Sequence, residues 1–119
     1  MKIPGLYIGK WRIVEMDQWN QEFVDLIVPG HVTIRKDGKG SFQFGAVEGE
    51  MDCQVQKTAT HEQIEFAWDG FDECDPASGR GWVRVDGEDM AGHLFFHEGD
   101  EKTAHVGVHY AEYASELKL

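Results

Sequence analysis

The sequence predicts an all-β fold: a small antiparallel up-and-down meander that closes into a barrel of about eight strands. From residue 31 onward, apolar and polar residues alternate with a period of two, the pattern of half-buried strands. The chain contains 14 glycines, many of them between short apolar runs, as expected for tight hairpin turns. A flat sheet of eight strands would leave two exposed edges, and closure removes them. We therefore expect a single barrel domain over residues 1–119, with one short helix after the first strand.

In the N-terminal part of the chain, the spacing of the apolar residues changes once. Residues 10–16 alternate as the first strand, and apolar side chains then recur at a spacing near four. Asp17 is a suitable N-cap, and Pro29 with Gly30 is a suitable end. These features predict a helix over 17–28.

The remaining strands are expected to follow as hairpins. They are predicted at residues 31–36, 41–47, 50–57, 62–68, 81–86, 90–97 and 103–110. Residues 37–40 and the Glu48–Gly49 pair are the expected turns between the earlier strands. The connection across 68–82 is too long for a simple hairpin turn, so we expect a structured loop there.

The charge balance restricts the classes of partner. The chain has 22 acidic and 11 basic residues, a formal net charge of -11, which repels phosphate backbones and anionic lipid. We therefore expect neither nucleic-acid nor membrane binding. The N-terminus lacks the apolar core of a signal peptide, which favours a soluble, cytoplasmic protein with Cys53 and Cys74 as reduced, buried thiols.

The long connection is strongly acidic and contains one arginine. Carboxylates on a tight loop could bind calcium or magnesium, although their spacing does not match an EF-hand. The alternative is a structural loop in which Arg80 pairs with a nearby carboxylate and folds the loop over the barrel. A pair of carboxylates used for acid–base catalysis is a further option. The acidic residues are Asp69, Asp72, Glu73 and Asp75.

Aromatic side chains at inward positions are the candidates for a ligand cavity. An eight-stranded barrel can hold one small apolar molecule, or it can fill its interior with side chains. Both alternatives remain open from the sequence. The candidate ligand-binding residues are Trp11, Phe44, Phe66, Trp68 and Trp82.

Four histidines lie on the last predicted hairpin. If the turn brings their faces together, all four lie on the face opposite the apolar residues, where two or three imidazoles could bind one metal ion. A register shifted by one residue would separate the two pairs. The alternative is that they are ordinary surface histidines. They are His93, His97, His105 and His109.

Two resemblances add to this interpretation. The strings GKWRIVEMDQW, DLIVPG, DGKGSFQFGAVEGEMDC, FAWDGFDECDPASGRGW and GHLFFHEGD resemble a family of small uncharacterised bacterial proteins over about residues 9 to 100. That resemblance implies no particular activity. Gly9-Lys10-Trp11 is also similar to the Gly-x-Trp of calycin barrels (lipocalins and fatty-acid-binding proteins), which implies a barrel with a hydrophobic ligand.

Three functions are expected, in this order. The first is a non-enzymatic binding module that holds a small or apolar molecule in or at the mouth of the barrel. The second is a structural protein with a filled core that self-associates, for example as a homodimer. The third is a metal-dependent or carboxylate-based enzyme. No cofactor is expected.

Overall fold

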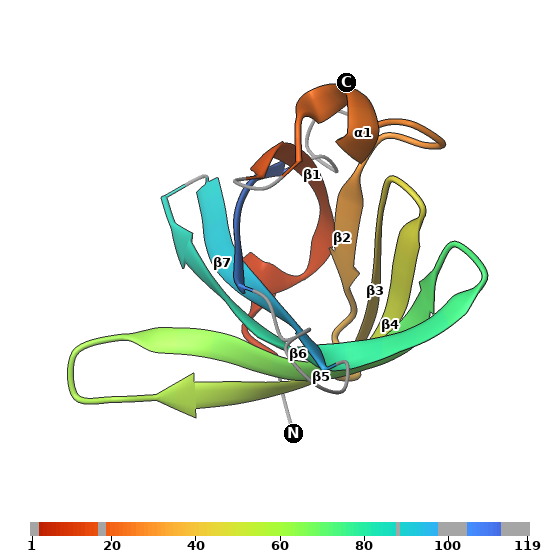
Figure 1. Ribbon diagram of the computed structural model, residues 1–119. Helices are drawn as coiled ribbons and strands as arrows, with labels where there is room; N and C mark the ends of the chain where they lie inside the picture. Colours follow the sequence, from red (N-terminus) through yellow and green to blue (C-terminus); the bar gives the residue numbers. More distant parts are fainter. Residues whose placement is uncertain (1–2, 17–18, 88, 98–104, 113–119) are drawn as a thin grey trace.

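The protein is a closed antiparallel β-barrel. The computed structural model describes residues 3–16, 19–87, 89–97 and 105–112, with Asp86 and 105–112 described by their backbone alone. The elements are η1 (Gly5–Tyr7), β1 (Gly9–Met16), α1 (Gln21–Val24), β2 (His31–Ile34), β3 (Lys39–Phe44), β4 (Val47–Lys57), β5 (Glu62–Asp72), β6 (Asp75–Asp86), β7 (Asp89–His97) and β8 (His105–Glu112). Each strand pairs with the next, and β8 pairs with β1 (Figure 1). The predicted fold class is confirmed.

The alternation of apolar and polar residues in the sequence corresponds to side chains that point alternately into the barrel and out to solvent. Along β4, Val47, Gly49, Met51 and Cys53 are buried, and the residues between them are exposed. The same alternation holds along β3 and β7. The inward side chains of the described strands join in one hydrophobic core.

The helix is much shorter than predicted. It covers four residues instead of 17–28, and its N-cap is Asn20, whose side chain accepts a hydrogen bond from the backbone N–H of Phe23 at 2.9 Å. The predicted cap, Asp17, lies outside the described residues. Leu26 and Ile27 completed the apolar pattern of the sequence, but they lie beyond the helix and are exposed. Apolar spacing alone therefore overestimated its length.

The turn predicted at Glu48–Gly49 is part of β4. The chain turns three residues earlier, where Phe44 pairs with Val47 and Gly45 adopts a φ of 57°. That left-handed conformation favours glycine. Gly49 instead faces the core and leaves room for two neighbouring aromatic rings.

Both ends of the barrel are covered. At one end, η1 places Tyr7 in the core, where the backbone carbonyl of Tyr7 accepts a hydrogen bond from Nε1 of Trp11 at 3.0 Å. At the other end lies α1, seen at the top of Figure 1. There Trp19 packs on Phe44 with ring centroids 5.0 Å apart, and on Phe23 at 6.0 Å.

Candidate functional site

Four of the five predicted ligand-binding residues lie inside the barrel. Trp11, Phe44, Phe66 and Trp68 are each exposed by no more than 4%. The aromatic rings pack on one another: Phe42, for example, contacts Trp68 edge-on with centroids 5.1 Å apart. Among the described side chains, these four therefore contribute to a packed aromatic core.

Glycines on the inner face make this filling possible. A Cβ on Gly49 would lie 2.7 Å from Cε3 of Trp68 and 2.8 Å from Cζ of Phe42. A Cβ on Gly81 would meet the ring of Phe66. Each large ring thus lies against a position without a side chain, the alternation of large and small residues expected in a small barrel.

Trp82, the fifth predicted residue, lies on the outer face and does not share the interior. Its ring lies between the Arg84 guanidinium, 4.8 Å from the ring centroid, and the imidazole of His93 at 4.9 Å. Arg84 also donates to Gln63 Oε1 at 2.9 Å and contacts His61 Nε2 at 2.9 Å. The tryptophan is therefore part of a surface cluster on β5, β6 and β7.

The predicted acidic loop is in fact a long β-hairpin. β5 and β6 stay paired up to Asp72 and Asp75, so that only Glu73 and Cys74 form the turn. Pro76 and Gly79 suggested turns in this stretch, but both lie inside β6, where Gly79 faces the core. The prediction of a structured loop across 68–82 was wrong for this reason.

The acidic residues of this hairpin do not form one cluster: Asp72 and Asp75 are cross-strand partners at its tip, whereas Asp69 pairs with Ser78. Asp69, Asp72, Glu73 and Asp75 are all exposed. Arg80 is exposed opposite Ala67, and among the described residues it forms no ion pair with any of them. The predicted role of Arg80, neutralising the cluster and folding a loop over the barrel, is therefore wrong, because Arg80 is an exposed residue of a paired strand and no loop is present for it to fold.

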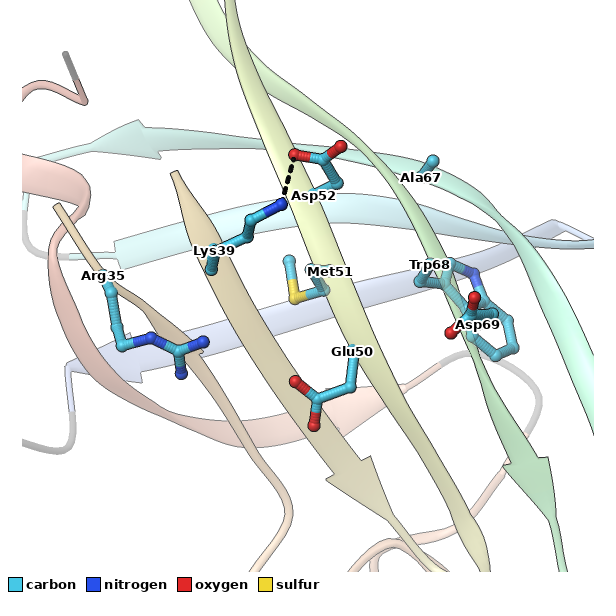
Figure 2. A pocket seen from close by; sticks show the side chains of 8 residues that line it. All are labelled: Arg35, Lys39, Glu50, Met51, Asp52, Ala67, Trp68 and Asp69. Carbon is cyan, nitrogen blue, oxygen red and sulfur yellow. Dashed lines mark hydrogen bonds and ion pairs between the residues drawn. The ribbon is translucent and has the colours of Figure 1, made fainter. Parts of the chain in front are cut away.

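A different group of charged residues lines a groove on the outer face of β3, β4 and β5. This feature, which we call the charged groove, has a volume of about 430 Å³ and is shown in Figure 2. Arg35 and Lys39 lie on one side of it, and Glu50 and Asp69 on the other. Lys39 Nζ lies 3.5 Å from Asp52 Oδ1 in an exposed ion pair. The groove is lined as well by Met51, Ala67 and Trp68.

Two carboxylates face one another across strands in this groove. Glu50 and Asp69 are direct partners in the β4–β5 register. Like charges at directly opposed positions destabilise a sheet. Asp69 also borders two neighbouring grooves of about 340 and 400 Å³, one of them reaching His31 and the other His97. Asp69 thus lies where three grooves of the outer surface adjoin, and Glu50 borders two of them.

The predicted metal-binding histidines are placed by the register of the last hairpin. Phe95 pairs with His105 and Ala91 with His109, so that these positions lie on the same face of the sheet as His93 and His97. The side chains of His105 and His109 lie outside the described atoms. Among the side chains that are described, no group of three or more His, Cys, Asp or Glu is suited to a metal ion.

The two cysteines differ in environment. Cys53 is buried, and burial raises the pKa of its thiol to about 11, with Asp52 adding to the effect. Cys74 lies in the β5–β6 turn and is exposed, so the prediction that both thiols are buried was wrong for Cys74. Neither cysteine forms a disulfide.

The sequence interpretation missed most of the charged groove. Arg35, Lys39, Glu50 and Asp52 were not among the candidates. Asp69 was a candidate as part of the acidic connection, and Trp68 as a residue of the barrel interior. The signal was present in the period of two, which places the charged residues of adjacent strands on one outer face. The strand register brings these residues together. It could not be derived from the sequence, because the turns that set it were predicted at the wrong residues.

The comparisons with known proteins add no relative. A scan against models of protein families, a search among curated proteins and a search among solved structures each found no match. Within the described ranges, no helix is long and apolar enough to cross a membrane.

Proposed function

We propose that the protein is a non-enzymatic binding module that holds a small zwitterionic molecule in the charged groove. The observation that supports this most is the opposition of Glu50 and Asp69 beside Arg35 and Lys39. A ligand ammonium group between the carboxylates would relieve their repulsion. An anionic group on the same ligand would meet the arginine and the lysine.

The availability of these charges supports the proposal. Glu50, Asp69 and Arg35 form no ion pair with another described residue, and the single ion pair in the groove is the exposed one between Lys39 and Asp52. Arginine binds carboxylates and phosphates through two parallel hydrogen bonds, which suits it to orient the anionic end of a ligand. The volume of the groove is in the range of small-molecule sites.

Binding inside the barrel is less well supported than binding on its outer face. The aromatic residues that would line a cavity are packed against one another and against inward glycines. An apolar molecule at the α1 end would have to displace Trp19 or Phe23. Denaturing mass spectrometry of the purified protein is the test of this version, since it would reveal a co-purified apolar ligand.

The open form of the groove favours binding over catalysis. Acid–base chemistry by two carboxylates needs a site that excludes water and shifts their proton affinities apart. Glu50 and Asp69 are exposed on the outer face of the sheet. This setting suits recognition of charge and provides no enclosed reaction site.

The test is a calorimetric titration with a matched series of ligands. γ-Aminobutyrate carries both charges, while butylamine and butyrate carry one each. We expect heat of binding with γ-aminobutyrate or a longer or shorter ω-amino acid, and markedly weaker binding of the singly charged compounds. Glu50→Gln, Asp69→Asn and Arg35→Gln should each weaken it about tenfold, the loss expected for one charge-assisted contact.

Glu22→Gln is the matched control, because Glu22 is an exposed carboxylate on α1, away from the groove. It should leave the affinity unchanged. Absence of heat with every ω-amino acid at millimolar concentration, or equal binding by the three groove variants and the wild type, would contradict the proposal.

Self-association is the second candidate, because two adjacent apolar side chains are exposed. Leu26 and Ile27 have exposed fractions of 64% and 61%. A second copy of the chain could bury them. Sedimentation equilibrium tests this directly: a dimer that Leu26→Ser with Ile27→Ser dissociates would support it, and a monomer at high micromolar concentration would exclude it.

A further inference from the structure

We propose that the charged groove continues past Ala67 into a second groove, where Arg80 binds a second acidic group of the ligand. This inference rests on the proposed function, because it extends the same site. The class of ligand that follows is an α-amino dicarboxylic acid, such as glutamate. Its ammonium group and its two carboxylates would each have a partner of opposite charge on the outer face.

A row of four residues across the strands connects the two grooves. Lys39 pairs with Asp52, Asp52 with Ala67, and Ala67 with Arg80. Figure 2 shows the first three of them, with Asp52 between Lys39 and Ala67. Residues directly opposite one another lie on the same face of a sheet. The row therefore crosses the outer face from the lysine of the charged groove to Arg80.

The second groove lies next to the charged groove at Ala67. It has a volume of about 200 Å³, and its lining includes Asp52, Ala67 and Arg80. Asp52 and Ala67 also line the charged groove, so the two grooves adjoin. Ala67 is exposed, and its side chain is a single methyl group. A longer side chain at this position would separate the two grooves, whereas the alanine leaves them connected.

Arg80 is the charged residue of the second groove that is available to a ligand. Of the carboxylates in this groove, Asp52 forms the ion pair with Lys39 at 3.5 Å. Glu65 Oε2 accepts a hydrogen bond from Gln63 Nε2 at 2.9 Å. Arg80 forms no ion pair with another described residue. Its guanidinium can therefore bind a ligand carboxylate through two parallel hydrogen bonds.

The position of Arg80 relative to Asp69 determines where the second acidic group must lie. Asp69 pairs with Ser78, two residues before Arg80, so Asp69 and Arg80 are diagonal neighbours, about 7–8 Å apart at Cα. In the proposed function, the ligand ammonium group lies between Glu50 and Asp69. A carboxylate on the carbon that carries the ammonium group is then within reach of the long Arg80 side chain. The other carboxylate would meet the arginine and the lysine of the charged groove.

The experiment is calorimetry with matched pairs of ligands that differ by one carboxylate. Glutamate is γ-aminobutyrate with a carboxylate added to the carbon that carries the amine. Aspartate with β-alanine is the corresponding shorter pair, and α-aminoadipate with δ-aminovalerate is the longer one. In the pair that binds most tightly, we expect the dicarboxylate to bind about tenfold more tightly than its partner, the gain expected for one charge-assisted contact.

Variants of two residues test the source of this gain. Arg80→Gln should remove it, so that both members of a pair bind equally. Ala67→Leu should reduce it, because a larger side chain would separate the two grooves, whereas Ala67→Ser should retain it. Lys57→Gln is the matched control for the loss of one positive charge, because Lys57 is exposed at the end of β4 and lines neither groove. It should retain the gain. Circular dichroism establishes that each variant is folded.

The outcomes distinguish this inference from the proposed function. Equal binding of both members of each pair by the wild type would overturn the inference and leave the proposed function intact. A gain that persists in folded Arg80→Gln would do the same, because another residue would then bind the second carboxylate. The absence of heat with every compound of the three pairs would overturn both.

Discussion

Asp25 joins three separate segments of the chain through its carboxylate. Arg12 on β1 donates to both oxygens, at 2.6 and 2.9 Å. The backbone N–H of Gly30 donates at 2.8 Å, and Gln21 Nε2 donates at 3.0 Å. The Arg12 hydrogen bonds lower the pKa of Asp25 well below its usual range, with further contributions from Gly30 and Gln21. This residue therefore attaches α1 and the following loop to the barrel.

Asp25→Asn should lower the free energy of unfolding by about 1–2 kcal/mol near neutral pH. This value is smaller than for a fully buried ion pair, because Arg12 and Asp25 are partly exposed to solvent. The folded pKa of Asp25 is depressed, so its contribution is present above the unfolded pKa of about 3.9 and is lost as the pH falls through the folded pKa. Urea unfolding should therefore show a smaller difference between variant and wild type near pH 3 than near pH 7.

Glu22→Gln is the comparison for this effect, because Glu22 is an exposed carboxylate on α1, the helix that Asp25 follows. It should change stability little at either pH. An Asp25→Asn variant as stable as the wild type near neutral pH would show that the carboxylate does not hold the segment.

Gly81 tests the packing of single residues in the interior. A methyl group at this position would meet the Phe66 ring and lie 2.7 Å from the carbonyl oxygen of His93. Gly81→Ala should therefore destabilise the protein by about 1–3 kcal/mol. Gly5→Ala, where nothing lies within 4 Å, should stay within about 0.5 kcal/mol of the wild type in thermal or urea unfolding. Equal stability of the two variants would argue against the close fit of rings and glycines.

At the scale of elements, two adjacent turns can be compared. The β3–β4 turn has Gly45 at its first central position, with a φ of 57°, and the β5–β6 turn has Glu73 there, with a φ of 59°. The N–H of Glu73 donates to the carbonyl of Ala46 at 2.9 Å, which joins the two turns. A left-handed conformation costs a residue with a side chain about 1–2 kcal/mol.

Glu73→Gly should accordingly raise the free energy of unfolding by about 0.5–1 kcal/mol, part of the gain being offset by the entropy of glycine in the unfolded chain. Gly45→Ala should have the opposite effect, because its methyl group would also meet the ring of Phe23. Thermal unfolding of both variants gives the comparison. Destabilisation by Glu73→Gly would show that the carboxylate has a role in the turn beyond backbone conformation.

The elements also show which parts of the fold the sequence predicted. The period of two located the strands, since those whose side chains are described bury one face and expose the other more. The errors arose at glycines. Gly49 and Gly79 were interpreted as signs of turns or loops, whereas each lies within a strand and makes room for an aromatic ring. Contacts between strands that are distant in the sequence decide which interior positions must lack a side chain. A single sequence does not show these contacts.

The site was less predictable than the fold for a related reason. Asp72 and Asp75 meet at the tip of the β5–β6 hairpin, but Asp69, which is close to them in the sequence, pairs with Ser78 further along the strands. Glu50 and Asp69 are 19 positions apart and meet through the β4–β5 register (69 minus 50). Closeness in the sequence therefore did not indicate which acidic residues lie together in the structure. The cross-strand register decides this, and it was not known.

At the scale of the whole molecule, the two thiols report on opening of the barrel. Cys74 is exposed, while Cys53 is buried with a pKa raised to about 11, so it is rarely a thiolate at neutral pH. An alkylating reagent should therefore label one thiol per native chain quickly, at Cys74. Cys53 should react after unfolding in urea, as peptide mass spectrometry can establish. Rapid labelling of Cys53 in the native protein would indicate that the barrel opens near β4.

The central claim for the whole molecule is that its ligand lies on the outer face of the barrel and not within it. The most direct measurement is an amide chemical-shift map recorded while the ω-amino acid that binds most tightly is added. We predict that the perturbed amides cluster at Arg35, Lys39, Glu50 and Asp69 around the charged groove. Perturbations centred instead on the interior residues Trp11, Phe44 and Phe66 would contradict this claim.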